Sequence, residues 1–188
     1  MMPGKADKPT QNSALQGISE QENFMIRVLF ICHGNICRST MAQSVFSHLV
    51  TQAGLADSFE IDSAATSREE IGNTPHYGTV NKLRQEHIPL IPHQARQMTR
   101  NDYLYYDYLI GMDSANIRNM IRIAGGEDRL EKIYKMLSFA GYEQMHKLTG
   151  ARDVADPWYT GDFDATYRDV LEGCEGLLAY VREKEKMR

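Results

Sequence analysis

The sequence predicts an α/β fold with three layers, in which a central four-stranded parallel, twisted sheet carries helices on both faces. Short apolar runs typical of buried strands alternate with segments whose apolar residues recur every three or four positions, as on one face of a helix. Strands buried on both faces belong to a parallel sheet, because the connecting helices cover both of its sides. At 188 residues the chain has the length of one such domain rather than two.

The first elements follow from the apolar run 26–32, which predicts a strand. Apolar residues at helical spacing predict a helix over 40–52 that ends near Gly54, since glycine is common just after a helix. The run 59–63 predicts a second strand, and a second helical pattern spans residues 80–87.

The middle of the chain opens with residues 88–92, which we expect to be irregular because they contain two prolines three positions apart. Thr99 and Asp102 form the pattern of a capping box, which predicts the start of a short helix. The run 107–112 predicts the third strand, and a helical pattern over 117–124 is stopped by the glycine pair that follows it.

The ends of the chain differ in character. Residues 133–139 predict a fourth strand, a polar loop follows, and residues 164–186 predict a long amphipathic helix. Residues 1–23 carry little that could be buried and predict a disordered extension, which leaves a single domain over 24–188.

Composition limits the possible partners and compartments. Asp and Glu number 25 against 21 Lys and Arg, so charge gives no reason to expect nucleic acid or an anionic membrane as partner. No stretch approaches 18 apolar residues and the start lacks the apolar centre of a signal peptide, so we expect a cytoplasmic protein without membrane insertion. An odd number of cysteines, three, fits a reducing compartment.

The most informative stretch joins the first strand to the first helix and reads Cys-His-Gly-Asn-Ile-Cys-Arg-Ser from Cys32 to Ser39. A loop between a buried strand and a helix start directs several backbone N–H groups and the positive end of the helix dipole at one place, where an anion can bind. Cys32 lies in the same field, which favours its nucleophilic thiolate over the thiol. Arg38 can return its guanidinium to phosphoryl oxygens with two parallel hydrogen bonds.

The predicted phosphate-binding groups are the backbone N–H groups of this loop, which come from His33, Gly34, Asn35, Ile36, Cys37 and Arg38. Gly34 and Asn35 suit a loop that needs left-handed backbone angles. A positively charged His33 would aid anion binding; the alternative is a side chain that faces solvent. We expect neither a metal nor a cofactor, because the histidines show no zinc-ligand spacing with cysteine or carboxylate.

Asp156 is the strongest candidate for proton transfer. Hydrolysis through a thiol-phosphate ester needs a proton donor for the leaving oxygen and then a base for water, and a carboxyl group can serve as both. Pro157 stiffens the loop of Asp156, and the aromatic rings of Trp158 and Tyr159 could form the walls of a slot for a flat ring. The structural alternative is a turn before a helix, for which Asp-Pro is also common.

The two motifs, C-x-G-N-x-C-R-S and the distant Asp-Pro-aromatic-aromatic, resemble those of the low-molecular-weight protein tyrosine phosphatases, and the resemblance covers about residues 25–182. It implies hydrolysis of protein phosphotyrosine and small aryl phosphates through a cysteinyl-phosphate intermediate. In this scheme Cys32 is the nucleophile, Arg38 and the loop amides bind phosphate, and Asp156 is the general acid and then the base. The implied partners are a phosphotyrosine protein and, in the site, phosphate or another oxyanion.

The resemblance also implies two supporting roles. Ser39, which could otherwise be a plain N-cap, donates its hydroxyl to the thiolate, and His93 hydrogen-bonds Asn35 to hold the loop in shape. Two positions depart from the family pattern. Thr40 stands where proline is usual, and Glu69 lies in the rim of the substrate pocket where relatives often carry an aromatic residue.

Other functions remain as alternatives. Phosphoarginine phosphatases of the same family tend to have threonine where Ile36 stands, and an apolar Ile36 favours an aryl substrate. Thiol-dependent arsenate reductases share the loop and the fold but need further cysteines near mid-chain, and residues 38–173 contain none. A phosphate-binding module without catalysis is the non-enzymatic alternative, which the joint presence of Cys32, Arg38 and Asp156 disfavours.

Cys37 has two interpretations. It could form a reversible disulfide with Cys32 under oxidation and so protect the nucleophile, which would make the protein redox-sensitive. It could equally be a packed loop thiol, because disulfide geometry is restrictive. Cys174 is predicted to lie in the core, and we expect a monomer or a weak dimer.

Overall fold

The structure is a computed structural model that describes residues 25–148 and 151–187. The described residues form one parallel sheet in the order β2-β1-β3-β4. Its strands are β1 (Ile26–Cys32), β2 (Phe59–Ala65), β3 (Tyr108–Gly111) and β4 (Ile133–Lys135). This architecture confirms the predicted fold class. The expected disordered extension over residues 1–23 lies outside the described residues.

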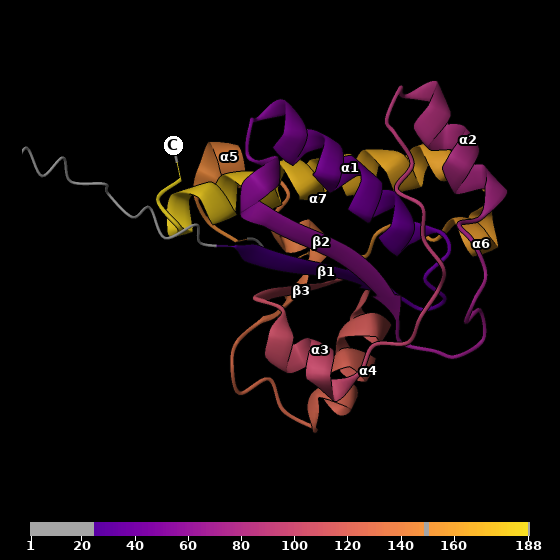
Figure 1. The fold of residues 1–188 in the computed structure, drawn as a ribbon, viewed down its shortest axis with the longest axis horizontal. Coiled ribbons are helices and arrows are strands. Elements are labelled where there is room, and N and C mark those ends of the chain that lie inside the picture. Colours follow the sequence, from indigo (N-terminus) through magenta and orange to yellow (C-terminus); the bar gives the residue numbers. More distant parts are fainter. Residues whose placement is uncertain (1–24, 149–150, 188) are drawn as a thin grey trace, which may run out of the picture.

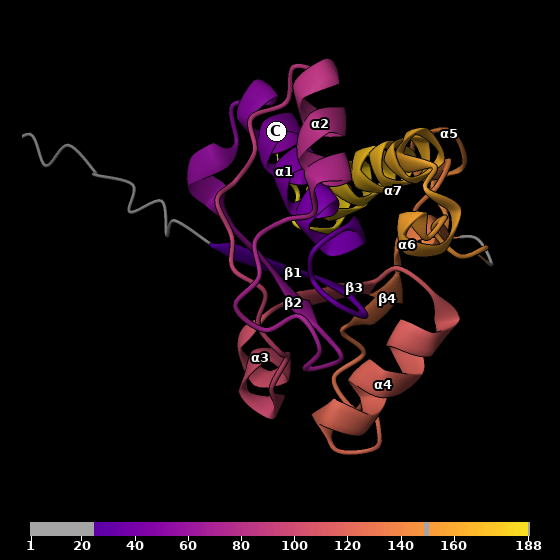
Figure 2. The same cartoon turned by 90° about the vertical axis from the view of Figure 1, so that its right-hand side faces the viewer.

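Helices cover both faces of the sheet, as Figures 1 and 2 show. Helices α1, α2, α5 and α7 lie on one face, α3 and α4 lie on the other, and α6 lies near the carboxyl ends of the strands. Their bounds are α1 (Arg38–Gln52), α2 (Tyr77–Gln85), α3 (Arg100–Tyr105), α4 (Ser114–Ala124), α5 (Tyr142–Met145), α6 (Pro157–Thr160) and α7 (Phe163–Lys184).

The alternating side chains of β1 supply the centre of both apolar layers. Val28 and Phe30 belong to the cluster that packs under α1 and α7, whereas Leu29 and Ile31 belong to the cluster under α3 and α4. All four side chains are 0% exposed. A strand buried on both faces therefore fixes the position of Cys32, which ends it.

Several predicted bounds are confirmed. A capping box between Thr99 and Asp102 starts α3 as expected, and Gly125 ends α4 with a φ of 120° that suits glycine. The long amphipathic helix is α7.

Other predicted bounds are wrong by a few residues. Helix α1 starts at Arg38 rather than at residue 40. Strand β2 continues to Ala65 rather than ending at residue 63, because it pairs with β1 as far as Cys32. The single-turn helices α5 and α6 form where a loop is expected.

The fourth strand is the largest error in the predicted elements. It covers Ile133–Lys135 only, and Met136–Ser138 form a turn of 3-10 helix instead of continuing the strand. The reason lies in α7, where a side chain at Gly173 would overlap Met136 and one at Gly176 would overlap the carbonyl of Phe139. These two glycines let the backbone after β4 approach α7 closely, and its apolar side chains are buried there.

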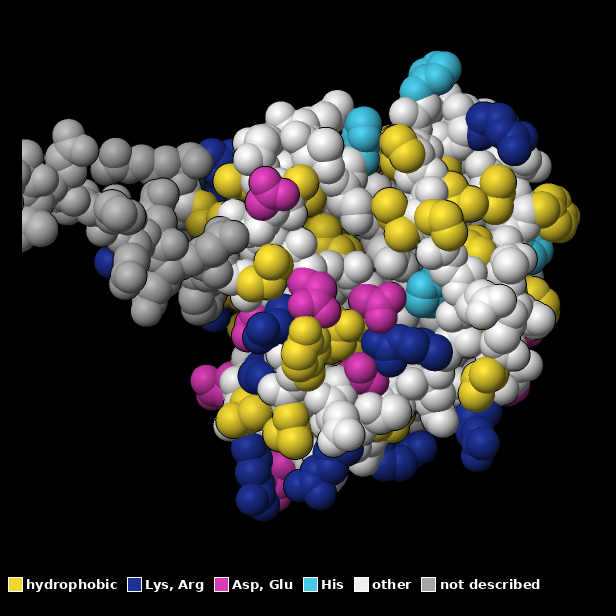
Figure 3. All heavy atoms as spheres, in the orientation of Figure 1, with side chains coloured by type: hydrophobic (Ala, Val, Ile, Leu, Met, Phe, Trp, Pro, Cys, Tyr) yellow, Lys and Arg dark blue, Asp and Glu magenta, His cyan; other side chains and the backbone are white. Residues whose placement is uncertain are grey.

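The surface carries no large area of one charge on the face shown in Figure 3, where acidic and basic side chains are mixed. This agrees with the formal net charge of −4. Within residues 25–148 and 151–187, none of the helices has the length and apolar character needed to cross a membrane.

Candidate active site

The sulfur of Cys32 receives hydrogen bonds from the loop that follows β1. Cys32 is only 3% exposed. Its Sγ accepts the backbone N–H of Asn35 at 3.2 Å and lies 3.1 Å from Oγ of Ser39. Helix α1 starts directly after the loop without a side-chain cap, so the free N–H groups of its first turn and its dipole lie at the same place. Hydrogen-bonding groups and the positive end of the helix dipole therefore meet at this sulfur.

Ser39 lies inside the first turn of α1, and Cys37 occupies the N-cap position. The alternative that Ser39 is a plain N-cap is therefore wrong. Its Oγ accepts a hydrogen bond from Nδ2 of Asn35 at 2.9 Å, which leaves its own hydrogen for the sulfur of Cys32.

Asn35 holds the loop in shape. Its φ of 60° lies in the left-handed region, as predicted, and the residue is fully buried. Besides Ser39, its Nδ2 donates to Oγ of Ser63 at 2.9 Å, while its Oδ1 accepts Nε2–H of His93 at 2.7 Å and the backbone N–H of Arg96 at 3.1 Å. All four hydrogen-bonding positions of the side-chain amide are occupied, so the left-handed conformation is enforced.

Gly34 does not have the left-handed backbone that we predict for it, since its φ is not among the positive values. A side chain here would instead require Glu70 to shift slightly. A Cβ at this position would lie 3.1 Å from Cγ of Glu70, which packs against the loop.

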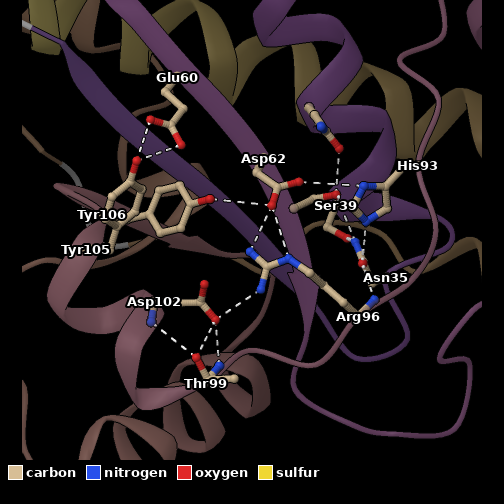
Figure 4. A network of polar contacts seen from close by, with 12 residues as sticks. Asn35, Ser39, Glu60, Asp62, His93, Arg96, Thr99, Asp102, Tyr105 and Tyr106 are labelled. Atoms are coloured by element: carbon tan, nitrogen blue, oxygen red, sulfur yellow. Dashed lines mark hydrogen bonds and ion pairs between the residues drawn. The ribbon is translucent and has the colours of Figure 1, made fainter.

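A polar network behind the loop fixes His93, as Figure 4 shows. Nδ1 of His93 lies 3.6 Å from Oδ1 of Asp62, and Arg96 donates to both Asp62 and Asp102. Burial lowers the pKa of His93, with Asp62 opposing this effect and Arg96 adding to it. The neutral ring at pH 7 carries its hydrogen on Nε2, because Oδ1 of Asn35 can only accept.

Arg38 is buried at the start of α1 and is held by two carboxylates. Its Nη1 donates to Oδ2 of Asp113 at 2.7 Å, and its Nη2 lies 2.7 Å from Oδ2 of Asp156. Burial lowers the pKa of Arg38, but the charges of Cys32, Asp113 and Asp156 outweigh it and raise the pKa overall. The guanidinium therefore stays charged beside the sulfur, in position for an anion.

Asp156 reaches the loop from the far end of the sequence. It is the N-cap of α6, where its Oδ1 accepts the backbone N–H of Trp158 at 3.1 Å. The structural alternative of a turn before a helix is thus confirmed, while the role of Asp156 in proton transfer stays a prediction. The capping bond leaves Oδ2 for Arg38. One carboxyl group serves the helix and the site.

A cavity of about 120 Å³ lies between these groups. Its lining contains most of the residues predicted for the site, namely Cys32, His33, Gly34, Ile36, Cys37, Arg38, Glu69, Asp156, Trp158 and Tyr159, together with Glu70, which we do not predict. The remaining predicted residues, Asn35, Ser39 and His93, support the loop from behind.

The rim of the cavity combines aromatic and charged side chains. Trp158 is 60% and Tyr159 85% exposed. On the other side, Nε2 of His33 lies 3.1 Å from Oε2 of Glu69. The ring of His33 is solvent-exposed at the cavity, as the second interpretation expects, and its help in anion binding stays a prediction.

The three cysteines are free thiols in different settings. Burial, followed by the charges of Cys32 and Asp156, raises the pKa of Cys37 to about 12, so it stays protonated at neutral pH. Cys174 is 0% exposed in the core, as predicted. Cys32 is the cysteine that receives hydrogen bonds to its sulfur from the loop.

Sequence reasoning misses Asp113, although a signal for it exists. Asp113 follows β3 directly, and the carboxyl ends of neighbouring parallel strands meet at one edge of the sheet. It caps α4 through Oδ1 and binds Arg38 through Oδ2.

Comparisons with known proteins agree with this geometry. Residues 27–187 match the family described as low molecular weight phosphotyrosine protein phosphatase. The chain is 37% identical over 163 residues to the low molecular weight protein-tyrosine-phosphatase YfkJ of Bacillus subtilis, a match that covers 87% of this chain and 100% of that protein. It is also 37% identical to the low molecular weight phosphotyrosine protein phosphatase of Rattus norvegicus, covering 80% and 92% of the two chains.

Solved structures of two related proteins share the fold of this chain. The crystal structure of YfkJ superposes with a TM-score of 0.78 at 38% identity, covering 86% of this chain and 97% of that chain. The crystal structure of DARP, a Drosophila arginine phosphatase, superposes with a TM-score of 0.71 at 28% identity, covering 84% and 98%.

Proposed function

Because the chain belongs to the low molecular weight phosphotyrosine protein phosphatase family, we propose that it hydrolyses protein phosphotyrosine and small aryl phosphates through a phosphocysteine at Cys32. One observation carries the proposal. Cys32 and Asp156, far apart in the sequence, line one cavity, and Arg38 lies 2.7 Å from the carboxylate of Asp156. A nucleophile, an anion-binding cation and a proton donor therefore share one site.

In the first step the sulfur of Cys32 attacks phosphorus in line with the bond to the leaving oxygen. The loop N–H groups and Arg38 stabilise the negative charge on the other phosphoryl oxygens, and such fixed donors usually contribute the largest part of the rate. The substrate's phosphoryl oxygens replace the carboxylate of Asp156 on Arg38. Asp156, which takes up a proton from solvent in this complex, then gives that proton to the phenolate as the P–O bond breaks. The phosphoryl group is then bonded to sulfur, and the phenol leaves.

In the second step the carboxylate of Asp156 removes a proton from water, which attacks the phosphocysteine. The P–S bond breaks, inorganic phosphate forms and the thiolate returns. The Oγ–H of Ser39 and the N–H of Asn35, both directed at the sulfur, support its departure as an anion.

The walls of the cavity favour an aryl group. Ile36 is apolar and 8% exposed in the lining, and the indole of Trp158 can pack on a ring. The second candidate is phosphoarginine, since one structural neighbour is an arginine phosphatase. The arsenate reductase alternative lacks a relay, because no cysteine lies between Cys37 and the core residue Cys174.

The proposal predicts the order of rates on three matched peptides that carry phosphotyrosine, phosphoserine or phosphoarginine. We expect kcat/KM to be highest for phosphotyrosine, by about tenfold or more over phosphoserine, because a buried ring contributes about 1.5–3 kcal/mol. Trp158→Ala should reduce the rate on phosphotyrosine more than on phosphoserine. If phosphoarginine were hydrolysed fastest, the protein would be a phosphoarginine phosphatase instead. Equal rates on all three peptides would show that the site does not recognise the tyrosine ring.

Three further expectations belong to this proposal. The protein acts in the cytoplasm as a monomer or a weak dimer, and oxidation pairs Cys32 with Cys37 reversibly. The two thiols line the same cavity, which supports the pairing. The alternative of a packed loop thiol stays open, since Cys37 lies in a buried cluster with Ile36 and Ala95.

A further inference from the structure

We propose that Thr166 and Asp169, two side chains of α7, are positioning residues for Asp156. They hold the backbone just before Asp156, so that its carboxyl group lines up with the leaving oxygen. The inference rests on the proposed function, because it concerns the proton transfer of that reaction. Neither side chain touches the substrate; both act through Asp156.

Both residues bind the peptide groups of Ala155. Oδ2 of Asp169 accepts the N–H of Ala155 at 2.9 Å, and Oγ1 of Thr166 donates to its carbonyl at 2.8 Å. That carbonyl belongs to the peptide unit that joins Ala155 to Asp156, and the N–H belongs to the unit before it. Each peptide unit is planar and includes the Cα atoms at both of its ends. The bond to the Ala155 carbonyl therefore restrains the Cα of Asp156, and the bond to the Ala155 N–H restrains the peptide unit before it.

The two anchoring side chains are themselves fixed. Thr166 is 0% and Asp169 7% exposed. Oδ1 of Asp169 pairs with Nη1 of Arg152 at 2.7 Å, which compensates its charge and leaves Oδ2 for Ala155. Val154, which precedes Ala155, is also buried, and its N–H donates to the carbonyl of Met112 at 2.9 Å.

After Asp156 the support comes from the short helix α6, in which Pro157 is buried and Asp156 acts as the N-cap. Helix α6 is a single turn of four residues whose aromatic side chains are mostly exposed. A general acid must come within about 2.6–3.2 Å of the oxygen that it protonates, and a displacement of about 1 Å can cost about 10²-fold in rate. A single turn leaves room for such a displacement, so the alignment of Asp156 depends on the residues before it as well as on α6.

Helix α7 is a suitable support because it lies beside α1, as Figures 1 and 2 show. Sγ of Cys174 on α7 approaches the carbonyl of Ala42 on α1 at 3.9 Å, and Val170 belongs to the same buried cluster as Ala42. Helix α1 starts with Arg38. One pair of packed helices thus holds both the phosphate-binding guanidinium and the backbone of the proton donor.

The test uses substrates that differ in their need for a proton. Thr166→Val removes the hydroxyl and keeps the shape of the side chain. We expect kcat/KM for phosphotyrosine to fall about tenfold, and that for p-nitrophenyl phosphate, whose leaving group is a weaker base, to fall by about twofold or less. Thr166→Ser keeps the hydroxyl and should retain the rates of the wild type.

A double-mutant cycle separates positioning from general stability. In an Asp156→Asn background, Thr166→Val should cause no further loss of kcat/KM, because no proton donor remains to be positioned. Asp169→Ala is a second variant and should show the same dependence on substrate. It tests the inference even if Thr166→Val does not fold. Ser138→Ala removes a comparable hydroxyl-to-carbonyl hydrogen bond of 2.6 Å outside the site and should change neither rate.

Equal losses on both substrates, or an undiminished effect of Thr166→Val in the Asp156→Asn protein, would overturn the inference. Thermal unfolding of each variant shows whether it is folded at the assay temperature. A wild-type protein that hydrolyses p-nitrophenyl phosphate but not phosphotyrosine would instead refute the proposed substrate. The two failures are therefore distinguishable.

Discussion

Cys32→Ser is expected to abolish turnover on every phosphate ester, with a loss on the order of 10⁴-fold or more, as for other enzymes that lose their nucleophile. The proposed mechanism uses the sulfur of Cys32 as its nucleophile, and a serine hydroxyl in the same place remains protonated and attacks poorly. Initial rates on p-nitrophenyl phosphate and on a phosphotyrosine peptide measure the effect.

The control for this variant is anion binding. The loop N–H groups and Arg38 remain in Cys32→Ser, so inorganic phosphate should still raise its thermal unfolding temperature. A Cys32→Ser protein that hydrolyses aryl phosphates at a rate near that of the wild type would remove Cys32 from the mechanism.

Asp156→Asn is expected to lower kcat/KM for phosphotyrosine by about 10²–10⁴-fold, the usual contribution of general acid–base catalysis. The loss should shrink as the leaving group becomes less basic, since such groups depart without a proton. Asparagine can still accept the N–H of Trp158 as an N-cap, so the backbone of α6 should keep its conformation. A series of aryl phosphates with different leaving-group basicities gives the measurement.

Asp113→Asn is the matched control, because Asp113 is the other carboxylate on Arg38. It weakens the hold on the guanidinium but leaves the proton donor in place. Its kcat/KM should therefore fall by a similar factor for every leaving group. If Asp113→Asn showed the same leaving-group dependence as Asp156→Asn, the acid role could not be assigned to Asp156.

The strand, loop and helix around Cys32 could be predicted from the sequence because their signals are local. A run of apolar residues, a turn-forming Asn35 and an arginine at the helix start all lie within a few positions. Asp156 was different. Its Asp-Pro step is ordinary for a helix start, and its chemical role rests on resemblance to a family rather than on a physical pattern.

Asp169 and the end of β4 were missed for the same reason. Asp169 lies on α7 among many other charged residues, and its sequence position does not distinguish it from them. Only the folded structure shows that it contacts Ala155. The end of β4 was missed because Gly173 and Gly176 act from a helix some 35 to 40 positions away. Such contacts depend on tertiary packing, which local patterns do not contain.

The central claim is that the sulfur of Cys32 carries the phosphoryl group during the reaction. Acid quenching of the wild-type enzyme during turnover, followed by mass spectrometry of its peptides, tests this most directly. We predict a phosphoryl group on the peptide that contains both Cys32 and Cys37, located on Cys32 by fragmentation. A phosphoryl group on Cys37 or Ser39, or hydrolysis that continues without any labelled peptide, would contradict the account.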